Sequence, residues 1–282
     1  MKKILLFQLL LISALSAAPA LLSAAPVELK VASYNLRRSG TLPHDRWQNR
    51  APRCRELLKS EKFDIFGSQE TQIYHIRTIT GAGYKFIGEP RSSKSHSEYS
   101  AIFYNPEILE LQSEKTFWLS ETPDVPGSTS WKTACPRICT WGIFKHKASG
   151  KVFAFVNTHL DHKSLKAKEN GIKLILDNLS RFKNMPIILT GDFNSSPQSN
   201  VYQATAKRLS DARHIAEKVI PGPNGTFHGY KSDPAAWRVK FPIDYIFVDK
   251  ATVKVKTFQV INDYKNGKSS SDHFPVKATV VF

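Results

Sequence analysis

Two short clusters of acidic, amide and imidazole side chains carry the residue types that hydrolytic chemistry requires. Gly-Asp-Phe-Asn at 191–194 directly follows the apolar run Ile187–Thr190, and Ser-Asp-His at 271–273 precedes the apolar segment Pro275–Val281. A short apolar run is typical of a buried strand, and a glycine lets the chain turn sharply where a strand ends. Open α/β sheets bind ligands at such strand ends, so both clusters indicate a site. Turn residues that merely cap two strands are the alternative.

The segments that must position these clusters alternate between short strands and helices. Two amphipathic segments, His44–Glu61 and Lys163–Phe182, are predicted to be helices. Strands are predicted at Leu29–Asn35, Phe63–Gln69, Tyr99–Asn105, Ile108–Leu119, Ile138–His146, Val152–Thr158, Ile187–Thr190, Pro242–Val248 and Pro275–Val281. The third and fourth of these are expected to be antiparallel neighbours, and the fifth and sixth to form a hairpin. Two halves that each alternate strands and helices predict an α/β fold, with two sheets packed face to face and helices outside.

The first twenty-five residues have the order of a signal peptide. Lys2 and Lys3 precede an apolar stretch from Ile4 to Leu15, and small residues follow as far as Ala25. The apolar stretch is too short for a membrane span, and no later segment is predicted to cross a bilayer. We therefore expect export, to the periplasm or outside the cell, and one catalytic domain over residues 26–282. The exported protein is expected to be a monomer.

Charge and cysteine content narrow the partners and cofactors. The formal net charge is +16, which favours polyanionic partners such as nucleic acid or anionic lipid. A basic character that serves only solubility or attachment to the cell envelope is the alternative. The three cysteines do not make a disulfide framework, and their spacing lacks the pattern of a zinc site.

Six ordered motifs extend the two clusters over nearly the whole chain. They are Ser33-Tyr34-Asn35, Gln69-Glu70, Asn157-Thr158-His159-Leu160, Gly191-Asp192-Phe193-Asn194, Ile243-Asp244-Tyr245-Ile246 and Ser271-Asp272-His273. Together they resemble the endonuclease/exonuclease/phosphatase superfamily, whose fold is that of pancreatic deoxyribonuclease. The resemblance implies a four-layer α/β sandwich of two mostly antiparallel sheets. It also implies hydrolysis of phosphate esters with a divalent cation, usually Mg²⁺, with Mn²⁺ possible.

The chemistry of phosphate esters agrees with these residue types. The negative charge of a phosphodiester repels nucleophiles, so hydrolysis needs a hard cation, groups that bind the phosphoryl oxygens and a base aimed at water. Magnesium prefers a few carboxylates and keeps several waters. By the resemblance, Glu70 is the principal metal ligand, Asn35 holds metal or phosphate beside it, and Asp272 belongs to the metal shell.

The resemblance also gives roles to the remaining polar residues. Asp192 and Asn194 match the pair that orients the attacking water and binds phosphate. Asp244 matches the acid that fixes His273, which either takes a proton or stabilises the phosphoryl charge as an imidazolium. His159 is expected to pair with Glu98, and Arg137 is expected to contact the phosphate of the substrate.

Some polar residues are interpreted as structural. Asp161 and His162 are expected to begin the loop before a helix, and His228 is interpreted as a surface or core histidine.

The Asn-Thr-His-Leu motif and the long region from Thr116 to Thr140 most resemble the deadenylase branch and its exported bacterial relatives. The leader conflicts with a role on cytosolic messenger RNA. The first hypothesis is therefore an exported, metal-dependent phosphodiesterase, a nuclease on RNA or DNA that acts by direct attack of water. One alternative is an exported phosphatase or phospholipase of the inositol phosphate or sphingomyelin type. The other is a non-catalytic binding protein on the same fold.

Overall fold

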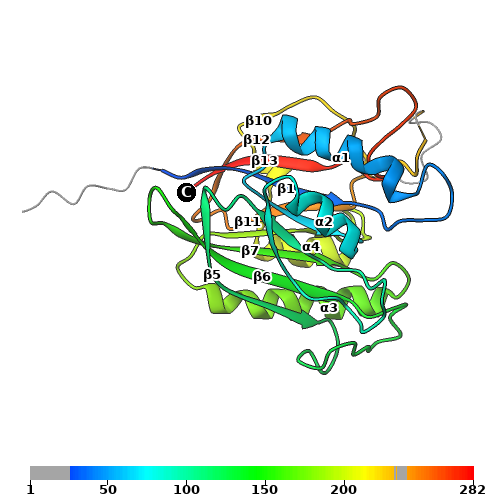
Figure 1. Cartoon of the computed structure of the whole chain (residues 1–282). Helices are drawn as coiled ribbons and strands as arrows, with labels where there is room; N and C mark the ends of the chain where they lie inside the picture. The colour runs from blue at the N-terminus through cyan, green and yellow to red at the C-terminus, as the bar shows by residue number, and fades with distance from the viewer. Residues whose placement is uncertain (1–25, 232, 234–239) are drawn as a thin grey trace, which may run out of the picture.

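The computed structural model describes residues 26–231, 233 and 240–282, so the predicted signal peptide lies outside the described residues. Two sheets pack face to face, and helices cover their outer faces (Figure 1). This confirms the predicted α/β sandwich. None of the helices in the described ranges is both long and apolar enough to cross a membrane.

The first sheet has seven strands in the order β10-β12-β13-β1-β2-β4-β3. Their bounds are β1 Glu28–Asn35, β2 Ile65–Gln69, β3 Lys85–Ile87, β4 Ile102–Tyr104, β10 Lys218–Val219, β12 Lys254–Val260 and β13 Val276–Val281. Strand β13 lies between β12 and β1, so the two ends of the chain meet in one sheet. The sheets therefore do not correspond to the two halves of the sequence: this sheet combines strands from both ends of the chain.

The second sheet has six strands in the order β5-β6-β7-β8-β11-β9. Their bounds are β5 Leu109–Trp118, β6 Ile138–His146, β7 Val152–His159, β8 Ile187–Asp192, β9 Ser210–Asp211 and β11 Asp244–Val248. Most neighbouring strands are antiparallel; β1 with β2, β7 with β8 and β10 with β12 are parallel. The predicted hairpin of β6 and β7 is confirmed.

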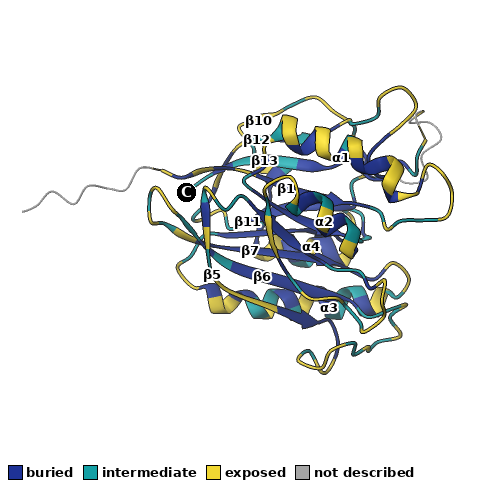
Figure 2. Ribbon diagram, viewed as in Figure 1, coloured by how far each residue is buried: buried dark blue, intermediate teal, exposed yellow. Residues whose placement is uncertain are grey.

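The helices separate the apolar residues into three layers of core. Helices α1 (Trp47–Glu61) and α2 (Ile73–Thr80) pack on the first sheet, and α3 (Leu165–Asn178) and α4 (Asn200–Arg208) pack on the second. A third apolar cluster fills the space between the sheets. Colouring by burial shows buried strands, while the helices expose one face (Figure 2). A short 3₁₀ helix at Leu179–Phe182 continues α3, and α5 (Ala212–Ile215) is a single turn.

One predicted strand pairing is wrong. Strands β4 and β5 were expected to be antiparallel neighbours, yet β4 pairs with β2 and β3, and β5 pairs with β6. The turn between them carries the chain from one sheet to the other. It is closed by Asn105, whose carbonyl accepts from Ile108 and Leu109. Two apolar runs joined by a short turn look like a hairpin in sequence, although here each run belongs to a different sheet. The sequence pattern also missed α2, α4 and β12.

A polar contact joins the two sheets directly behind the strand ends. Asn157 of β7 donates to the carbonyls of Ser68 and Ala101, and its oxygen accepts from Gln69 at 2.7 Å. A Cβ on Gly67 would lie 2.3 Å from the Asn157 oxygen, so only glycine permits this approach. Asn157 therefore fixes the strand ends of one sheet against those of the other.

Candidate active site

The strand ends converge because of the register of the two sheets. Asn35 at the end of β1 lies opposite Gln69 on β2, so Glu70 follows directly beside it. In the second sheet, Asp192 lies opposite both His159 and Asp244. These ends surround a reaction pocket of about 930 Å³. Of the residues assigned by the resemblance, those that line this pocket are Glu70, Glu98, Arg137, His159, Asp192, Asn194, Asp272 and His273.

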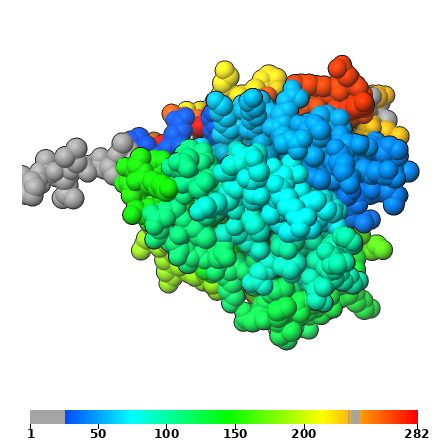
Figure 3. Space-filling view, viewed as in Figure 1, coloured from blue at the N-terminus to red at the C-terminus, as the bar shows by residue number. Residues whose placement is uncertain are grey.

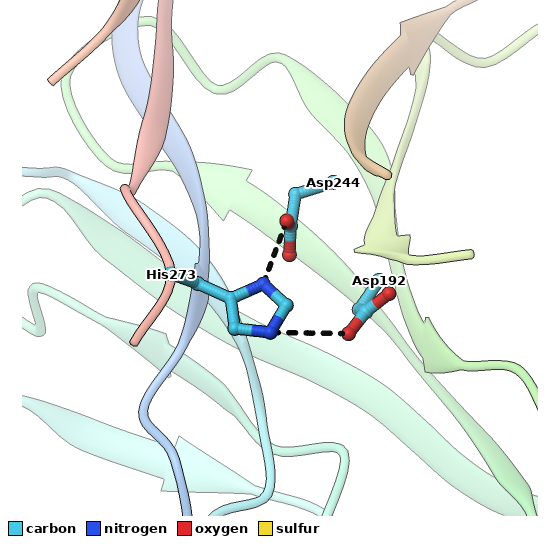
Figure 4. Close-up of side chains that lie close together, drawn as sticks. All are labelled: Asp192, Asp244 and His273. Carbon is cyan, nitrogen blue, oxygen red and sulfur yellow. Dashed lines mark hydrogen bonds and ion pairs between the residues drawn. The ribbon is translucent and has the colours of Figure 1, made fainter. Parts of the chain in front are cut away.

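A histidine between carboxylates forms the centre of the site (Figure 4). His273 Nδ1 lies 2.9 Å from Asp244 Oδ2, and its Nε2 lies 3.9 Å from Asp192 Oδ2. All three side chains are buried. The predicted role of Asp244, to fix the ring of His273, agrees with this geometry.

These contacts set the charge of the histidine. Burial opposes a charge on His273, but Asp244, Asp192 and Asp272 outweigh it and raise the pKa of His273 to about 10. Burial and the negative charge of Asp244 raise the pKa of Asp192 to about 7, while the positive charge of His273 limits this rise. At neutral pH the imidazole is therefore positively charged, and Asp192 can exchange a proton. Of the two roles that the sequence left open for His273, this charge favours stabilisation of the phosphoryl group.

Asp192, Asp244 and His273 each place a ligand atom within 4.8 Å of the others, a spacing that a metal ion could bridge. The geometry favours a proton on the His273 ring, shared with Asp244, over a metal ion bound by the three residues. Nδ1 of His273 is at hydrogen-bond distance from Asp244, and an imidazolium has no lone pair to offer a metal.

Glu70 and Asp272 fit a divalent cation better. Both carboxylates line the reaction pocket, and the negative charge of Glu70 adds to burial in raising the pKa of Asp272. A cation held by these carboxylates would offset this repulsion, and carboxylate oxygens are the ligands that Mg²⁺ prefers. Arg37 provides partial compensation: its guanidinium lies 3.8 Å from Glu70 and 3.5 Å from Asp272.

Asn35 connects these carboxylates. Its amide nitrogen donates to Asp192 Oδ2 at 3.0 Å and to Glu70 Oε1 at 3.4 Å, while its oxygen accepts from the Arg37 backbone. In this arrangement Asn35 orients the two acids, and direct binding of the metal by Asn35 stays a prediction. Glu70 has a φ of 54°, a conformation in which its carboxylate also accepts from the Arg38 backbone at 3.1 Å.

Asn194 joins the next two strand ends. Its backbone donates to Asp192 Oδ1 at 2.9 Å, and its side-chain amide donates to His159 Nε2 at 3.0 Å. Because Nε2 accepts, the proton of the His159 ring lies on Nδ1. Burial and the nearby charge of Arg137 hold the pKa of His159 well below its ordinary value, so this ring is neutral.

The expected pair of His159 with Glu98 is not the one that the structure forms. Both Glu98 oxygens contact the guanidinium of Arg91, at 2.8 and 2.9 Å. The strong attraction between a carboxylate and a forked guanidinium explains this preference over a neutral imidazole. Glu98 still lines the reaction pocket, and burial raises its pKa.

Arg137 is arranged to bind an anion. Its side chain is buried and contacts His162 Nδ1 at 2.9 Å and Asp161 at 3.6 Å. Its Nε and Nη1 atoms have no hydrogen-bond partner among the described residues. A buried N–H group without a partner is costly, and a phosphoryl oxygen in the pocket would satisfy it. This supports the predicted phosphate contact.

Asp161 has the structural role that the sequence indicated. It accepts from the backbones of Lys163 and Ser164, before α3, and from Ala134 and the Thr133 hydroxyl. The interpretation of its neighbour was incomplete, because His162 lines the reaction pocket beside Arg137.

Further residues of the pocket were missed by sequence reasoning. They include Arg37, Arg38, Arg91 and His228. His228 is buried as a core histidine, with its ring 4.2 Å from that of Phe274, yet it also lines the pocket. Only the position of Arg37 and Arg38, directly after the Ser33-Tyr34-Asn35 motif, was a signal in the sequence.

Comparisons with known proteins extend this description. The model of the Endonuclease/Exonuclease/phosphatase family matches residues 32–273. A solved protein of that family from Bacteroides thetaiotaomicron is 37% identical, with a TM-score of 0.84, covering 92% of this chain and 99% of that one. The mannosyl-6-phosphatase of B. thetaiotaomicron VPI-5482 is 38% identical, with a TM-score of 0.82, covering 90% and 100%. The 3′-5′-exoribonuclease subunit Ccr4 of Debaryomyces hansenii is 25% identical over 82% of this chain and 35% of its own length.

Proposed function

The chain belongs to the endonuclease/exonuclease/phosphatase family, and from this premise we propose that it is an exported, divalent-metal-dependent phosphatase of phosphorylated sugars. The observation that carries a hydrolytic role is the chain of contacts from Asp244 through His273 to Asp192, at 2.9 and 3.9 Å. It places a proton acceptor and a positive charge side by side at the wall of a pocket that also contains Glu70.

In the proposed reaction a water molecule attacks the phosphorus directly. Asp192, held by the Asn194 backbone and by Asn35, accepts a proton from this water. The imidazolium of His273 and the guanidinium of Arg137 stabilise the charge on the phosphoryl oxygens. A Mg²⁺ ion held by Glu70 and Asp272 would polarise the phosphoryl group. The bond from phosphorus to the sugar oxygen breaks without a covalent enzyme intermediate. The sugar oxygen takes a proton from water and leaves as an alcohol, and Asp192 returns the proton it accepted to the solvent.

The choice of a sugar phosphate rests on similarity and on charge. The mannosyl-6-phosphatase is 38% identical over its whole length, whereas the exoribonuclease subunit is 25% identical over about a third of its own length. A phosphate monoester presents three terminal oxygens, more than a diester does. The pocket offers His273 and Arg137 as donors to such oxygens.

The test compares substrates side by side. Inorganic phosphate released from mannose 6-phosphate is measured with Mg²⁺ and with a chelator, next to cleavage of an oligoribonucleotide, duplex DNA, an inositol polyphosphate and sphingomyelin. Phosphate release from the sugar that requires Mg²⁺ is expected. Cleavage of internal nucleic-acid bonds with no release from sugar phosphate would contradict the proposal.

A nuclease is the second candidate, because the net charge of +16 suits a polyanionic substrate. It predicts binding that weakens steeply as salt rises, since each phosphate contact releases counterions. A small sugar phosphate would show a much weaker dependence on salt.

Export of the protein rests on residues 1–25 alone. Expression with and without these residues, followed by fractionation of the cell, tests it: only the full chain should leave the cytoplasm. The monomeric state stays a prediction, which sedimentation would measure.

A further inference from the structure

A second hollow opens beside the reaction pocket. This basic groove has a volume of about 740 Å³ and lies between α1, the Pro43-His44 turn, residues 229–231 and the loop 264–269. It shares four lining residues with the reaction pocket: His44, Gly229, Tyr230 and Lys231. The two hollows therefore lie next to each other. The space-filling view shows the orange-red loop beside blue α1 at the upper rim (Figure 3).

The two hollows differ in charge. The reaction pocket is lined by charges of both signs: five carboxylates (Asp45, Glu70, Glu98, Asp192 and Asp272) together with four arginines and two lysines. The described residues that line the basic groove include no Asp or Glu, but they do include Arg53 and Lys268. A pocket with charges of both signs suits a cation together with the phosphate it binds, whereas a groove without carboxylates suits a ligand with its own negative charge.

Aromatic rings at the junction of the two hollows are held in place. The Tyr264 hydroxyl donates to the Tyr230 carbonyl at 2.9 Å, and the Tyr230 hydroxyl bonds to Asp45 at 3.1 Å. The ring of His44 meets that of Tyr230 edge-on, with centroids 5.0 Å apart. Rings fixed in this way offer apolar faces to a flat or ring-shaped ligand at little entropic cost. Gln48 and Asn49 of α1 add amides that can pair with hydroxyl groups.

We propose that the basic groove is a second substrate subsite, which binds the sugars beyond the phosphorylated end of an anionic oligosaccharide. The inference rests on the proposed sugar phosphatase. The reaction pocket alone is large enough for one phosphorylated hexose, so only a longer substrate would also occupy the adjoining groove. The cations select a chain that carries a further phosphate, and the rings and amides select sugars.

The test compares a short and a long substrate. The short probe is mannose 6-phosphate, and the long probe is a mannose oligosaccharide that carries two 6-phosphates. The ratio of their kcat/KM values is measured for the wild type, Lys268→Glu and Tyr264→Leu. The wild type should prefer the long probe. Each variant should lower the ratio about tenfold, as for one charged or stacking contact, and leave the short probe unchanged.

Matched controls separate the groove from the surrounding surface. Lys265 is an exposed lysine of the same loop that does not line the groove, so Lys265→Glu should keep the wild-type ratio. Tyr264→Phe keeps the ring and should keep most of the preference. A ratio near one in the wild type, or equal losses in Lys265→Glu and Lys268→Glu, would overturn the inference.

A nucleic-acid arm and a binding arm complete the experiment. A 3′-phosphorylated tetranucleotide is tested as a second long probe. If this nucleotide, and not the oligosaccharide, is preferred over mannose 6-phosphate and loses that preference in Lys268→Glu, the assignment to sugars is wrong. Calorimetric binding of the long probe to metal-free protein does not require turnover. If neither probe is hydrolysed, the proposed function fails. The subsite is still tested by binding: weaker binding of the long probe to Lys268→Glu than to Lys265→Glu would support it, and equal binding to the two variants would reject it.

Discussion

Asp244 Oδ2 lies 2.9 Å from His273 Nδ1, and both side chains are buried although they are 29 positions apart in the sequence. Asp244 begins β11 in one sheet, while His273 precedes β13 in the other. The contact therefore exists only when the two sheets are packed correctly, and it links the fold to the charge of the site.

Replacement of Asp244 by asparagine should remove the charge that holds His273 as an imidazolium. Asp244→Asn keeps the size of the side chain, so we expect the fold to persist. The turnover number kcat should fall by about 10²- to 10⁴-fold, the usual contribution of such a group, with a smaller change in KM. Steady-state kinetics with circular dichroism as the check on folding measure this. Equal losses in kcat and in substrate affinity would argue against a chemical role.

The stability of metal-free protein should depend on pH through His273. Its folded pKa of about 10 exceeds the ordinary 6.5, so the stabilisation is fully present below pH 6.5 and is lost as the pH rises to about 10. The slope is at most about 1.4 kcal/mol per pH unit. The raised pKa of Asp192, about 7, makes a destabilisation that grows between about pH 4 and 7 and is constant above pH 7, so Asp192 adds no slope in the higher pH range.

Urea unfolding in a chelator, from pH 7 to 10, measures this slope. His273→Gln should flatten the pH dependence in this window. An unchanged slope in the variant would show that another group is responsible.

Glu70→Gln should weaken metal binding without unfolding the protein. The carboxamide keeps the shape but loses the charge that a divalent cation needs. Calorimetry with Mn²⁺ should show at least about a tenfold higher Kd, in line with the loss of one charged ligand. Glu107→Gln, at an exposed position, is the control. Wild-type affinity in Glu70→Gln would place the metal elsewhere.

Arg50 should be the side chain whose loss most disturbs the loops of the site. It is fully buried and donates to the carbonyls of Asp45, Leu36, Arg37, Arg38 and Ser270. These carbonyls belong to the loop after β1 and the loop before β13. Arg50→Met would leave them without donors, so the free energy of unfolding should fall by about 3 kcal/mol or more.

The matched control for Arg50 is Arg53→Met on the same helix. Arg53 is partly exposed and bonds one carbonyl, that of Ser269, so its loss should cost only about 1 kcal/mol. Urea unfolding compares the two variants. Similar stabilities would show that the five contacts of Arg50 contribute little.

The acids and histidines of the site could be predicted because they directly follow or precede apolar strands. Asp192 and His273 occupy such positions, and a strand end fixes where a side chain points. Contacts between side chains were less predictable. Glu98 pairs with Arg91 in place of His159, because a nearby guanidinium competes for the carboxylate, and nothing in the spacing of the sequence reveals it.

The pairing of neighbouring strands was predictable only where the turn keeps both strands in the same sheet. Strands β6 and β7 form a hairpin, whereas β4 and β5 separate into different sheets after an equally short turn. Arg50 illustrates the same limit: it lies on a helix with an ordinary polar pattern, yet its partners are 5 to 220 positions away.

The most direct measurement is the release of inorganic phosphate from mannose 6-phosphate by wild type, Asp192→Asn and Glu70→Gln, with Mg²⁺ and with a chelator. Release by the wild type that stops in the chelator, and falls at least about 100-fold in both variants, is the predicted result. Undiminished release by either variant, or by the wild type without a divalent cation, would contradict a metal-dependent site built on these two carboxylates.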